Sequence, residues 1–221
     1  MMKKLISILI FSAVLFCSPS CKKDSADSSS GNSIGTDPSP MGAAGTTVSS
    51  SSAPIAGVSD LNAIVTSLAN GVSSYSGSGV VTNATIKNIL ANFPQFTISG
   101  DNVSVTDFQF RQTLGGIECL NSIGPGIIVN YNSSVGATYT VGTTGRTRTV
   151  VAKSTDDDYS YGMLLIKVVQ VEEPTPSLKS VGVSKVTYWA NHKFGLVGVQ
   201  YNFTDGTTAK FPVYCSTSNS K

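Results

Sequence analysis

From residue 95 onward, apolar and polar residues alternate with a period of two, which is the pattern of a half-buried β-strand. Glycine, asparagine, aspartate and proline residues separate nine segments of this kind. These are residues 96–99, 103–113, 126–131, 137–141, 146–153, 161–172, 181–190, 196–204 and 209–215. So many short strands at this spacing are typical of a sandwich or a barrel. The pattern predicts a mainly β, antiparallel domain over residues 95–221.

Three departures from simple alternation predict local detail. Residues 163–169 are apolar on both parities apart from Lys167, which predicts a central strand covered on both faces. The apolar parity slips between Val105 and Phe108, and again between Val183 and Val186. Each slip predicts a β-bulge, because one extra residue moves the following side chains to the other face.

The last predicted hairpin has its apolar residues at odd positions on both strands, including Val199 and Tyr201 on the first and Phe211 on the second. A shared core face requires odd positions to lie opposite odd positions. A two-residue Asp-Gly turn would pair odd with even. We therefore expect a three-residue loop, 205–207, with Gly206 at positive φ beside a bulge.

Residues 55–94 have apolar residues at helical spacing instead. One stripe could be capped by Ser59 or Asp60, and a second, capped by Thr82 or Asn83, would stop at Pro94. The stripes consist of Leu61, Ile64, Val65, Leu68 and Val72, and of Ile86, Ile89, Leu90 and Phe93. Helices this short are not stable alone in water. We expect a helical segment at 55–94 whose two short helices pack on the β domain.

Residues 25–53 are mostly serine, glycine, proline, threonine and alanine, with almost nothing to bury. Such a segment cannot offset the entropy lost on ordering. Residues 21–54 are therefore expected to form a flexible tether in front of the folded part.

The N-terminus has the features of a secretory signal. Lys3 and Lys4 precede an apolar run at residues 5–16, which is too short to span a bilayer. Residues 18–21, Ser-Pro-Ser-Cys, then resemble the lipobox of bacterial lipoprotein precursors, although that family usually has leucine where Ser18 stands. Residues 1–20 are expected to be the signal peptide. Cys17 is a competing lipidation site, and an ordinary cleaved secretory signal is the other alternative.

The lipobox resemblance implies that Cys21 carries two or three acyl chains, which are enough for stable attachment to a membrane. That covalent lipid is the only prosthetic group expected. In this family, aspartate after the cysteine is the usual inner-membrane retention signal, and here Lys22 follows. The resemblance thus implies a bacterial envelope protein, with the outer membrane favoured and its periplasmic or surface orientation open.

The charge balance excludes one class of partner. Only 13% of residues are charged, and the net charge is +2. Lys3 and Lys4 account for that excess, because removing them leaves 13 basic residues against 13 acidic ones. A neutral mature chain has no basic patch for a phosphate backbone, so no nucleic-acid partner is expected.

Two cysteines remain in the mature domain, Cys119 and Cys215, in a compartment that favours disulfides. A bridge between them would close a loop of nearly a hundred residues and stabilise the fold by about 4 to 5 kcal/mol. We expect that disulfide, with two buried free thiols as the alternative, because only geometry permits a bridge.

No pattern compels an enzymatic activity, and no catalytic or metal-binding residue is assigned. His192 is the only histidine, which excludes a multi-histidine metal site. A nucleophile pair of Cys119 and His192, oriented by Asn191, is conceivable, but no family signature surrounds Cys119. The acidic run at residues 156–158 is expected to be a solvated turn, because three consecutive carboxylates cannot all face one ion.

Recognition on β scaffolds commonly uses aromatic and polar residues in loops. The richest cluster in the sequence is Trp189, Asn191, His192 and Phe194, and the next is Tyr159 with Tyr161. The alternative is that Trp189 and Phe194 only fill the core.

Residues 199–206, a strand followed by an Asp-Gly turn, are similar to part of the jacalin-like β-prism lectins, although a threefold repeat is missing. We expect the domain to bind a macromolecule or a glycan. A structural envelope protein that recognises only its assembly partners is the alternative, and a hydrolase is a third.

Overall fold

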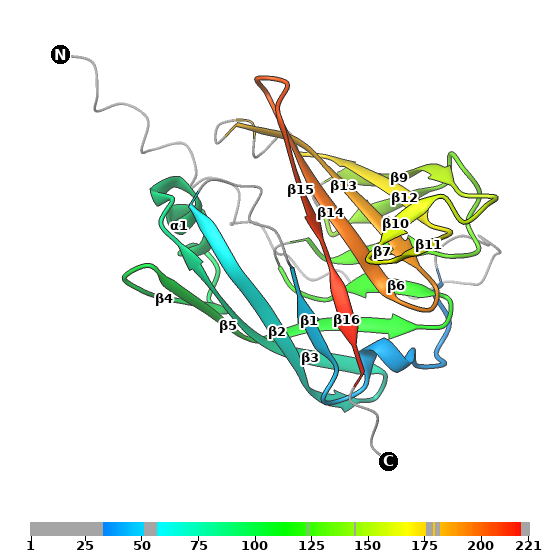
Figure 1. The fold of residues 1–221 in the computed structure, drawn as a ribbon, viewed down its shortest axis with the longest axis horizontal. Coiled ribbons are helices and arrows are strands. Elements are labelled where there is room, and N and C mark those ends of the chain that lie inside the picture. The colour runs from blue at the N-terminus through cyan, green and yellow to red at the C-terminus, as the bar shows by residue number, and fades with distance from the viewer. Residues whose placement is uncertain are drawn as a thin grey trace, which may run out of the picture.

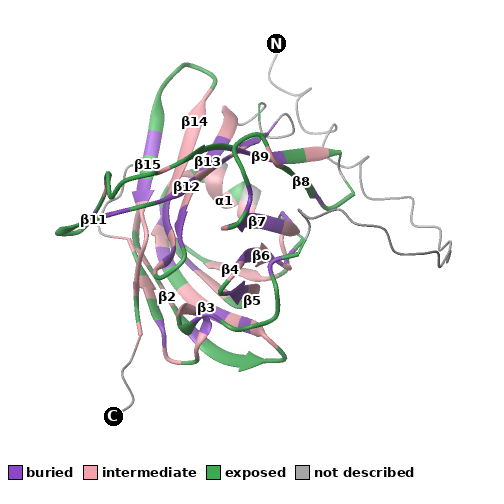
Figure 2. Ribbon diagram, turned by 90° about the vertical axis from the view of Figure 1, so that its right-hand side faces the viewer, coloured by how far each residue is buried: buried purple, intermediate pink, exposed green. Residues whose placement is uncertain are grey.

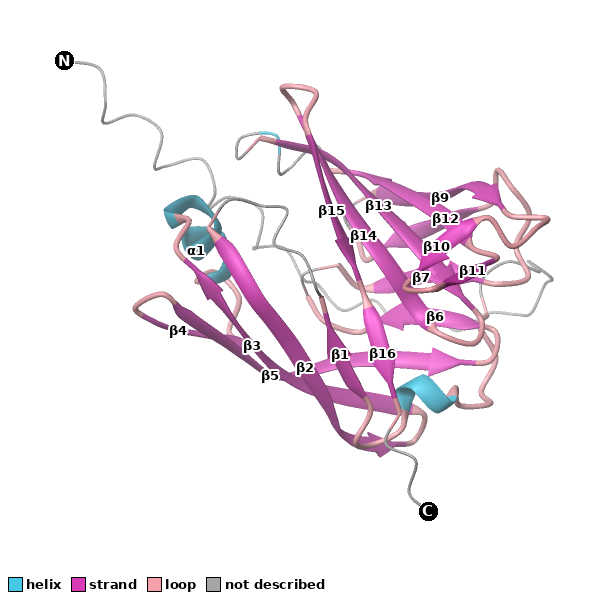
Figure 3. Cartoon of the chain, viewed as in Figure 1, coloured by secondary structure: helices cyan, strands magenta, loops and turns pink. Residues whose placement is uncertain are grey.

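The computed structural model describes residues 33–50, 57–122, 124–143, 145–175, 179 and 182–217. The expected signal peptide, Cys21 and the beginning of the expected tether lie outside this part. The described chain is mainly antiparallel β-structure in two large sheets and one small one (Figures 1 and 3). No helix among these residues is long and apolar enough to cross a bilayer.

The first sheet is strongly curled and contains eight strands (Figure 1). Its order is β16-β1-β2-β3-β5-β6-β7, with β4 paired to β5. The strands are β1 (Thr47–Ser49), β2 (Val58–Ala69), β3 (Val72–Val81), β4 (Phe96–Ser99), β5 (Asn102–Thr113), β6 (Gly116–Cys119), β7 (Gly126–Asn130) and β16 (Tyr214–Ser216).

The second sheet has the order β15-β14-β13-β12-β9-β8. Its strands are β8 (Thr138–Val141), β9 (Arg146–Lys153), β12 (Val169–Pro174), β13 (Val183–Asn191), β14 (Gly195–Phe203) and β15 (Thr208–Pro212). A separate hairpin consists of β10 (Tyr159–Tyr161) and β11 (Leu164–Ile166). Only Val213 separates β15 from β16, so the chain passes directly from the edge of the second sheet to the edge of the first.

The main core lies between the two sheets. It contains buried side chains of β6 and β7 together with Tyr139, Val150, Val171 and Ala190 of the second sheet. Val129, Val150 and Val171 are fully buried. Figure 2 shows buried residues in strands of both sheets, among them β7 and β12. The alternation of apolar residues that predicted the strands is therefore explained by burial of one face of each sheet.

A buried ion pair also links the sheets. Arg148 of β9 is 2% exposed, and its Nε donates to Glu173 Oε2 at 2.8 Å. The same guanidinium donates to the carbonyl oxygens of Gly124, Gly126 and Ile127, which precede or belong to β7. The charge of Glu173 is therefore matched within its own sheet, while the remaining donors of Arg148 bind the opposite sheet.

Of the two expected N-terminal helices, the first is wrong and the second is present only as a seven-residue helix, Ala84–Leu90. Residues 58–69 form β2, whose partner β3 follows after the Asn70–Gly71 turn. Ala69 lies opposite Val72, and Asn70 and Gly71 have φ of 52° and 75°. Both positive angles are what a two-residue type I′ hairpin requires, and Asn-Gly is its preferred sequence. The apolar residues at helical spacing wrongly predicted a helix here. In the structure, these residues pair with β3, and two bulges in β2 interrupt the regular alternation of a strand.

One seven-residue helix, α1 (Ala84–Leu90), is the only α-helix in the described part. Asn83 Oδ1 accepts from the backbone N–H of Ile86 at 3.2 Å and caps its first turn. Ile86 and Leu90 pack against buried Val58, Val81 and Val103. The helix thus covers a second, smaller core at one end of the curled sheet.

The expected tether is also wrong for residues 33–50. A 3-10 turn, η1 (Pro40–Gly42), and β1 lie in this stretch, with β1 between β2 and β16. Ile34 belongs to the main core, and its carbonyl accepts from Thr113 Oγ1. The expected boundary near residue 94 is absent too, because β3 pairs along its length with β5. Residues 33–50 are ordered although they contain few apolar side chains, because β1 forms backbone hydrogen bonds with both β2 and β16.

Both predicted bulges are confirmed. Phe108 lies opposite Tyr75 and Val105 opposite Gly77, so two residues of β5 face one of β3. The second register shift lies between Val183 and Lys185.

The last hairpin also has odd residues opposite odd ones, as predicted, with Tyr201 opposite Ala209. Gly206 has a φ of 87°. The loop is residues 204–206, one position earlier than expected, because the N–H of Phe203 already donates to the carbonyl of Thr207.

The predicted central strand at residues 163–169 is wrong. Met163 forms the tip of the β10–β11 hairpin and is fully exposed, and Leu164 and Leu165 are 53% and 60% exposed. Figure 2 shows this hairpin end as an exposed projection near β11. An apolar run on both parities predicted burial, but only Ile166 and the residues after Lys167 pack inside.

We predict that Arg148→Met destabilises the domain by about 3 to 5 kcal/mol, since it leaves the buried Glu173 carboxylate without its main partner. Lys185→Met is the matched control, because Lys185 pairs with the neighbouring Glu172 at the surface and should cost less than about 1 kcal/mol. Urea unfolding measures both. Equal, small effects of the two substitutions would contradict a role for Arg148 in joining the sheets.

Candidate functional site

An aromatic cluster lies where the β10–β11 hairpin packs on the second sheet. Buried Tyr161, Ile166, Val168 and Val197 form its base, with half-buried Tyr159, Trp189, Phe194 and Tyr214 around them. Tyr188 points toward the inter-sheet core, so Trp189, the next residue of β13, faces the opposite side of the sheet. The hairpin therefore lies on the face of the second sheet that is turned away from the main core.

Gly198 makes the closest approach of the hairpin possible. It lies opposite Trp189 in the register of β13 and β14. A Cβ at this position would come within 2.4 Å of the Tyr159 hydroxyl oxygen. Because glycine has no side chain, Tyr159 can lie over the β14 backbone beside Trp189, with ring centroids 6.0 Å apart and planes tilted by 32°.

Lys210 of β15 completes this arrangement. Its Nζ lies 4.3 Å from the ring centroid of Trp189 and 4.4 Å from that of Tyr159. Cation–π contacts of this kind are worth about 0.5 to 1 kcal/mol at exposed sites. Partial desolvation lowers the pKa of the Lys210 ammonium. We call Tyr159, Trp189 and Lys210 the aromatic platform.

Tyr161 anchors the hairpin below the platform. Its ring centroid lies 5.0 Å from that of Phe194 and 5.3 Å from that of Tyr214. Its hydroxyl oxygen accepts from the backbone N–H of Cys215 at 3.1 Å. Because Cys215 belongs to β16, this bond connects the hairpin to the first sheet as well.

Asn191 has a supporting role. Its amide Nδ2 donates to the carbonyl of Lys167 at 2.7 Å, and its Oδ1 accepts from the backbone N–H groups of Lys193 and Phe194. Asn191 is buried, and these hydrogen bonds hold the β13–β14 turn against the end of the hairpin. His192 lies in the same turn with its side chain exposed.

Four of the six predicted binding residues therefore come together: Tyr159, Tyr161, Trp189 and Phe194. Asn191 positions the turn beside them, and His192 lies outside the cluster.

Sequence reasoning missed Lys210 and Gly198. Both lie on strands that were predicted, but their role depends on the register of β14 between β13 and β15. The glycine itself was the available signal, since an isolated glycine inside a strand often marks close approach of another group.

The predicted disulfide is wrong. Cys119 and Cys215 are both free thiols. Cys119 lies on β6 and Cys215 on β16, and β1, β2, β3 and β5 separate these strands in the sheet. Burial raises the pKa of the Cys119 thiol, and it raises that of Cys215 to about 11. Neither thiol is therefore activated as a thiolate at neutral pH.

The hypothesis of a Cys119–His192 pair is not supported either. Cys119 is buried in the main core, where its thiol contacts Asn121, whereas His192 is exposed in the β13–β14 turn. The described residues contain no group of three or more histidine, cysteine, aspartate or glutamate side chains that could hold a metal ion. Residues 156–158 are all exposed, and Ser154 Oγ donates to Asp158 within this turn.

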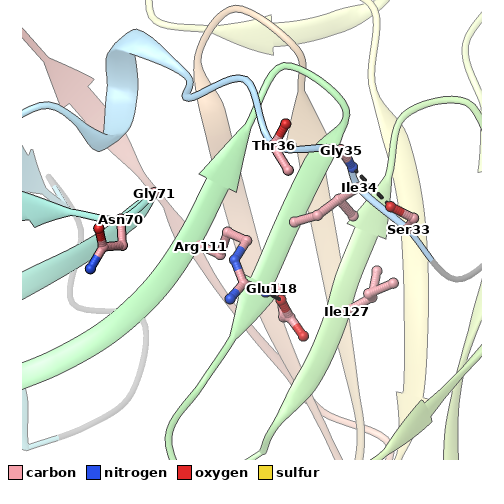
Figure 4. A pocket seen from close by; sticks show the side chains of 9 residues that line it. All are labelled: Ser33, Ile34, Gly35, Thr36, Asn70, Gly71, Arg111, Glu118 and Ile127. Carbon is pink, nitrogen blue, oxygen red and sulfur yellow. Dashed lines mark hydrogen bonds and ion pairs between the residues drawn. The ribbon is translucent and has the colours of Figure 1, made fainter.

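A cleft of about 520 Å³ lies elsewhere, on the first sheet (Figure 4). Residues 33–36 form one wall and the Asn70–Gly71 turn another. Arg111 and Glu118, on neighbouring strands, form an ion pair between these walls. Because the two charges are paired, they give the cleft no net charge.

Tyr159 offers a test of the platform's packing. Burial raises its pKa from 10.0 to about 12. The unfolded chain therefore loses this proton at lower pH than the folded chain, so the contribution of Tyr159 to stability is complete below pH 10 and is lost as pH rises toward 12.

We predict that Tyr159→Phe makes the fall in stability between pH 10 and 12 less steep, because phenylalanine has no proton to lose. Urea unfolding across this pH range measures the slope. An unchanged slope would mean that the Tyr159 hydroxyl is not buried against Gly198.

No protein-family model, curated protein or solved structure matches this chain. The chemistry of the site is therefore inferred from the described residues themselves. Among them, the aromatic platform combines two ring faces, a cation and partial exposure in one place.

Proposed function

We propose that this chain is a lipid-anchored bacterial envelope protein of the outer membrane, whose β domain binds a glycan or another macromolecule at the aromatic platform. The observation that supports the proposal most directly is that three residues distant in sequence lie together at one partly exposed place. Tyr159, Trp189 and Lys210 come from three separate segments and meet on the face of the second sheet that is turned away from the main core.

The chemistry of the platform suits a saccharide. Tryptophan and tyrosine rings offer flat apolar faces with a polar atom at one edge. A sugar ring has a matching apolar C–H face and hydroxyl groups at its rim. The platform also lies beside polar side chains of the same sheet, such as Gln200, whose partner in the register of β15 is Lys210.

The anchor half of the proposal has support from the lipobox-like residues 18–21 and from chain length. Ser33, the first described residue, is twelve positions after Cys21. Twelve residues span at most about 40 Å when fully extended. Since residues 33–50 belong to the folded domain, a lipid on Cys21 would hold the domain nearer to the membrane than a tether reaching residue 54 would.

One observation favours the second candidate, a structural protein that recognises an assembly partner. Met163, Leu164 and Leu165 are exposed together at the tip of the β10–β11 hairpin. Three consecutive large apolar residues on a projection suit contact with another protein. This surface is smaller than a standard protein interface, which makes the platform the stronger candidate.

We predict that Trp189→Ala lowers glycan affinity at least about 30-fold, the loss typical of an aromatic residue at the centre of an interface. Trp189→Phe should retain most of the affinity, because it keeps a ring face. A glycan array followed by calorimetry on the chain from Lys22 to Lys221 measures this.

Met163→Ser with Leu165→Ser is the matched control and should leave glycan affinity unchanged. A protein that binds no glycan, and forms a stable partner complex that only the Met163 and Leu165 substitutions break, would establish the second candidate instead.

We predict that Cys21→Ala releases the full-length chain from the membrane fraction of expressing bacteria, because the thiol that would carry the lipid is absent. Cys17→Ala is the control and should remain membrane-bound. Fractionation followed by immunoblotting measures the distribution. Release by the Cys17 substitution alone would place the lipid on the other cysteine.

A further inference from the structure

We infer that the aromatic platform selects acidic saccharides, with Lys210 as the residue that distinguishes a carboxylate-bearing sugar ring from a neutral one. The inference rests on the proposed glycan-binding function and names its ligand class. Three features of the platform carry it: the placement of the Lys210 ammonium, the lack of a carboxylate partner for it, and the cost of moving it.

The Lys210 ammonium contacts ring faces, whereas three other lysines of the described part contact oxygen atoms. Lys87 pairs with Asp101 and Lys185 with Glu172, each at 2.7 Å, while Lys153 donates to the carbonyl of Tyr131. No ion pair with Lys210 occurs among the described residues, and its Nζ lies over Trp189 and Tyr159. A partly desolvated cation that faces no carboxylate is a ready partner for an anion.

The position of the ammonium is fixed by the sheet. Lys210 lies opposite Gln200 of β14, two residues from Gly198, and Gly198 lies opposite Trp189. Because Gly198 has no side chain, nothing on β14 separates Lys210 from the Trp189 ring. The ammonium therefore covers the ring faces on which a sugar would stack.

A ligand must displace the ammonium from the rings before it can stack on them. For a neutral sugar this loses two cation–π contacts with no replacement. For an acidic sugar the displaced ammonium pairs with the carboxylate at the rim of the ring. A hydrogen bond to a charged group contributes about 1.5 to 3 kcal/mol, roughly 10-fold to 100-fold in affinity. The same lysine thus penalises neutral sugars and favours acidic ones.

A uronic acid fits these requirements better than a small free anion. Phosphate or acetate would pair with the ammonium but would leave the rings of Tyr159 and Trp189 uncovered. A uronic acid residue has both a carboxylate and an apolar ring face, so it can use both parts of the platform.

The test compares two ligands that differ only in charge: a uronic acid oligosaccharide and the same oligosaccharide with its carboxylates reduced to alcohols. Calorimetry on the chain from Lys22 to Lys221 measures both, with inorganic phosphate as a third probe. The wild-type chain should bind the acidic ligand at least about tenfold more tightly than the neutral one. Raising the salt concentration should reduce this preference, and phosphate should bind negligibly.

Lys210→Met should abolish the preference, with weaker binding of the acidic ligand and tighter binding of the neutral one than in the wild-type chain. Lys210→Arg should keep it, since arginine retains the charge and also stacks on aromatic rings. Lys185→Met is the control for loss of a lysine on the same sheet and should leave the affinity for both ligands unchanged. Thermal unfolding of each variant establishes that it is folded.

Equal binding of the two ligands by the wild-type chain, abolished by Trp189→Ala, would overturn the selectivity of Lys210 and leave the proposed function standing. Binding of neither ligand would overturn the inference, and the proposed function would fall with it only if the glycan array also showed no ligand. Tighter binding of phosphate than of the acidic oligosaccharide would show an anion site without sugar recognition and would also overturn the inference.

Discussion

The ion pair between Arg148 and Glu173 is the interaction on which the rest of the structure depends. Glu173 accepts from Arg148, from Arg146 at 3.0 Å and from the Tyr188 hydroxyl at 3.1 Å, so its buried charge is fully matched. The remaining donors of Arg148 bind carbonyl oxygens of β7 in the opposite sheet and of Gly124 just before it. A buried charge is costly unless every polar atom has a partner, and this requirement fixes how the sheets meet.

That fixed contact leaves the other face of the second sheet free for recognition. Tyr188 packs against the main core and donates to Glu173, so Trp189, the next residue of the strand, points away from the core. The hairpin then covers part of this face. Tyr161 anchors it to β16, and the Lys167 carbonyl at its end accepts a hydrogen bond from Asn191 of β13. Gly198 provides the space in which Tyr159 meets Trp189. The platform is thus built on the rigid strands of a sheet whose inner face is already fixed.

The sequence predicted the strands wherever one face packs on the core, because burial and alternation are then the same signal. Residues 96–99 and 146–153 were predicted with the observed bounds. The prediction failed at residues 58–69, where the Asn70–Gly71 hairpin turn outweighs a helical stripe, and at Met163, where an apolar run projects into solvent. It found most aromatic residues of the site but not Lys210, because only strand register places that side chain over the rings.

Trp189 is the only tryptophan in the chain, so its fluorescence reports on the platform alone. The most direct measurement is therefore a titration of the chain from Lys22 to Lys221 with an acidic oligosaccharide, followed by tryptophan emission and by calorimetry on the same samples. We expect a saturable change in emission with the same dissociation constant as the calorimetric one, since the ligand displaces Lys210 from the indole ring. Calorimetric binding with unchanged emission would place the ligand elsewhere and contradict the assignment of the site.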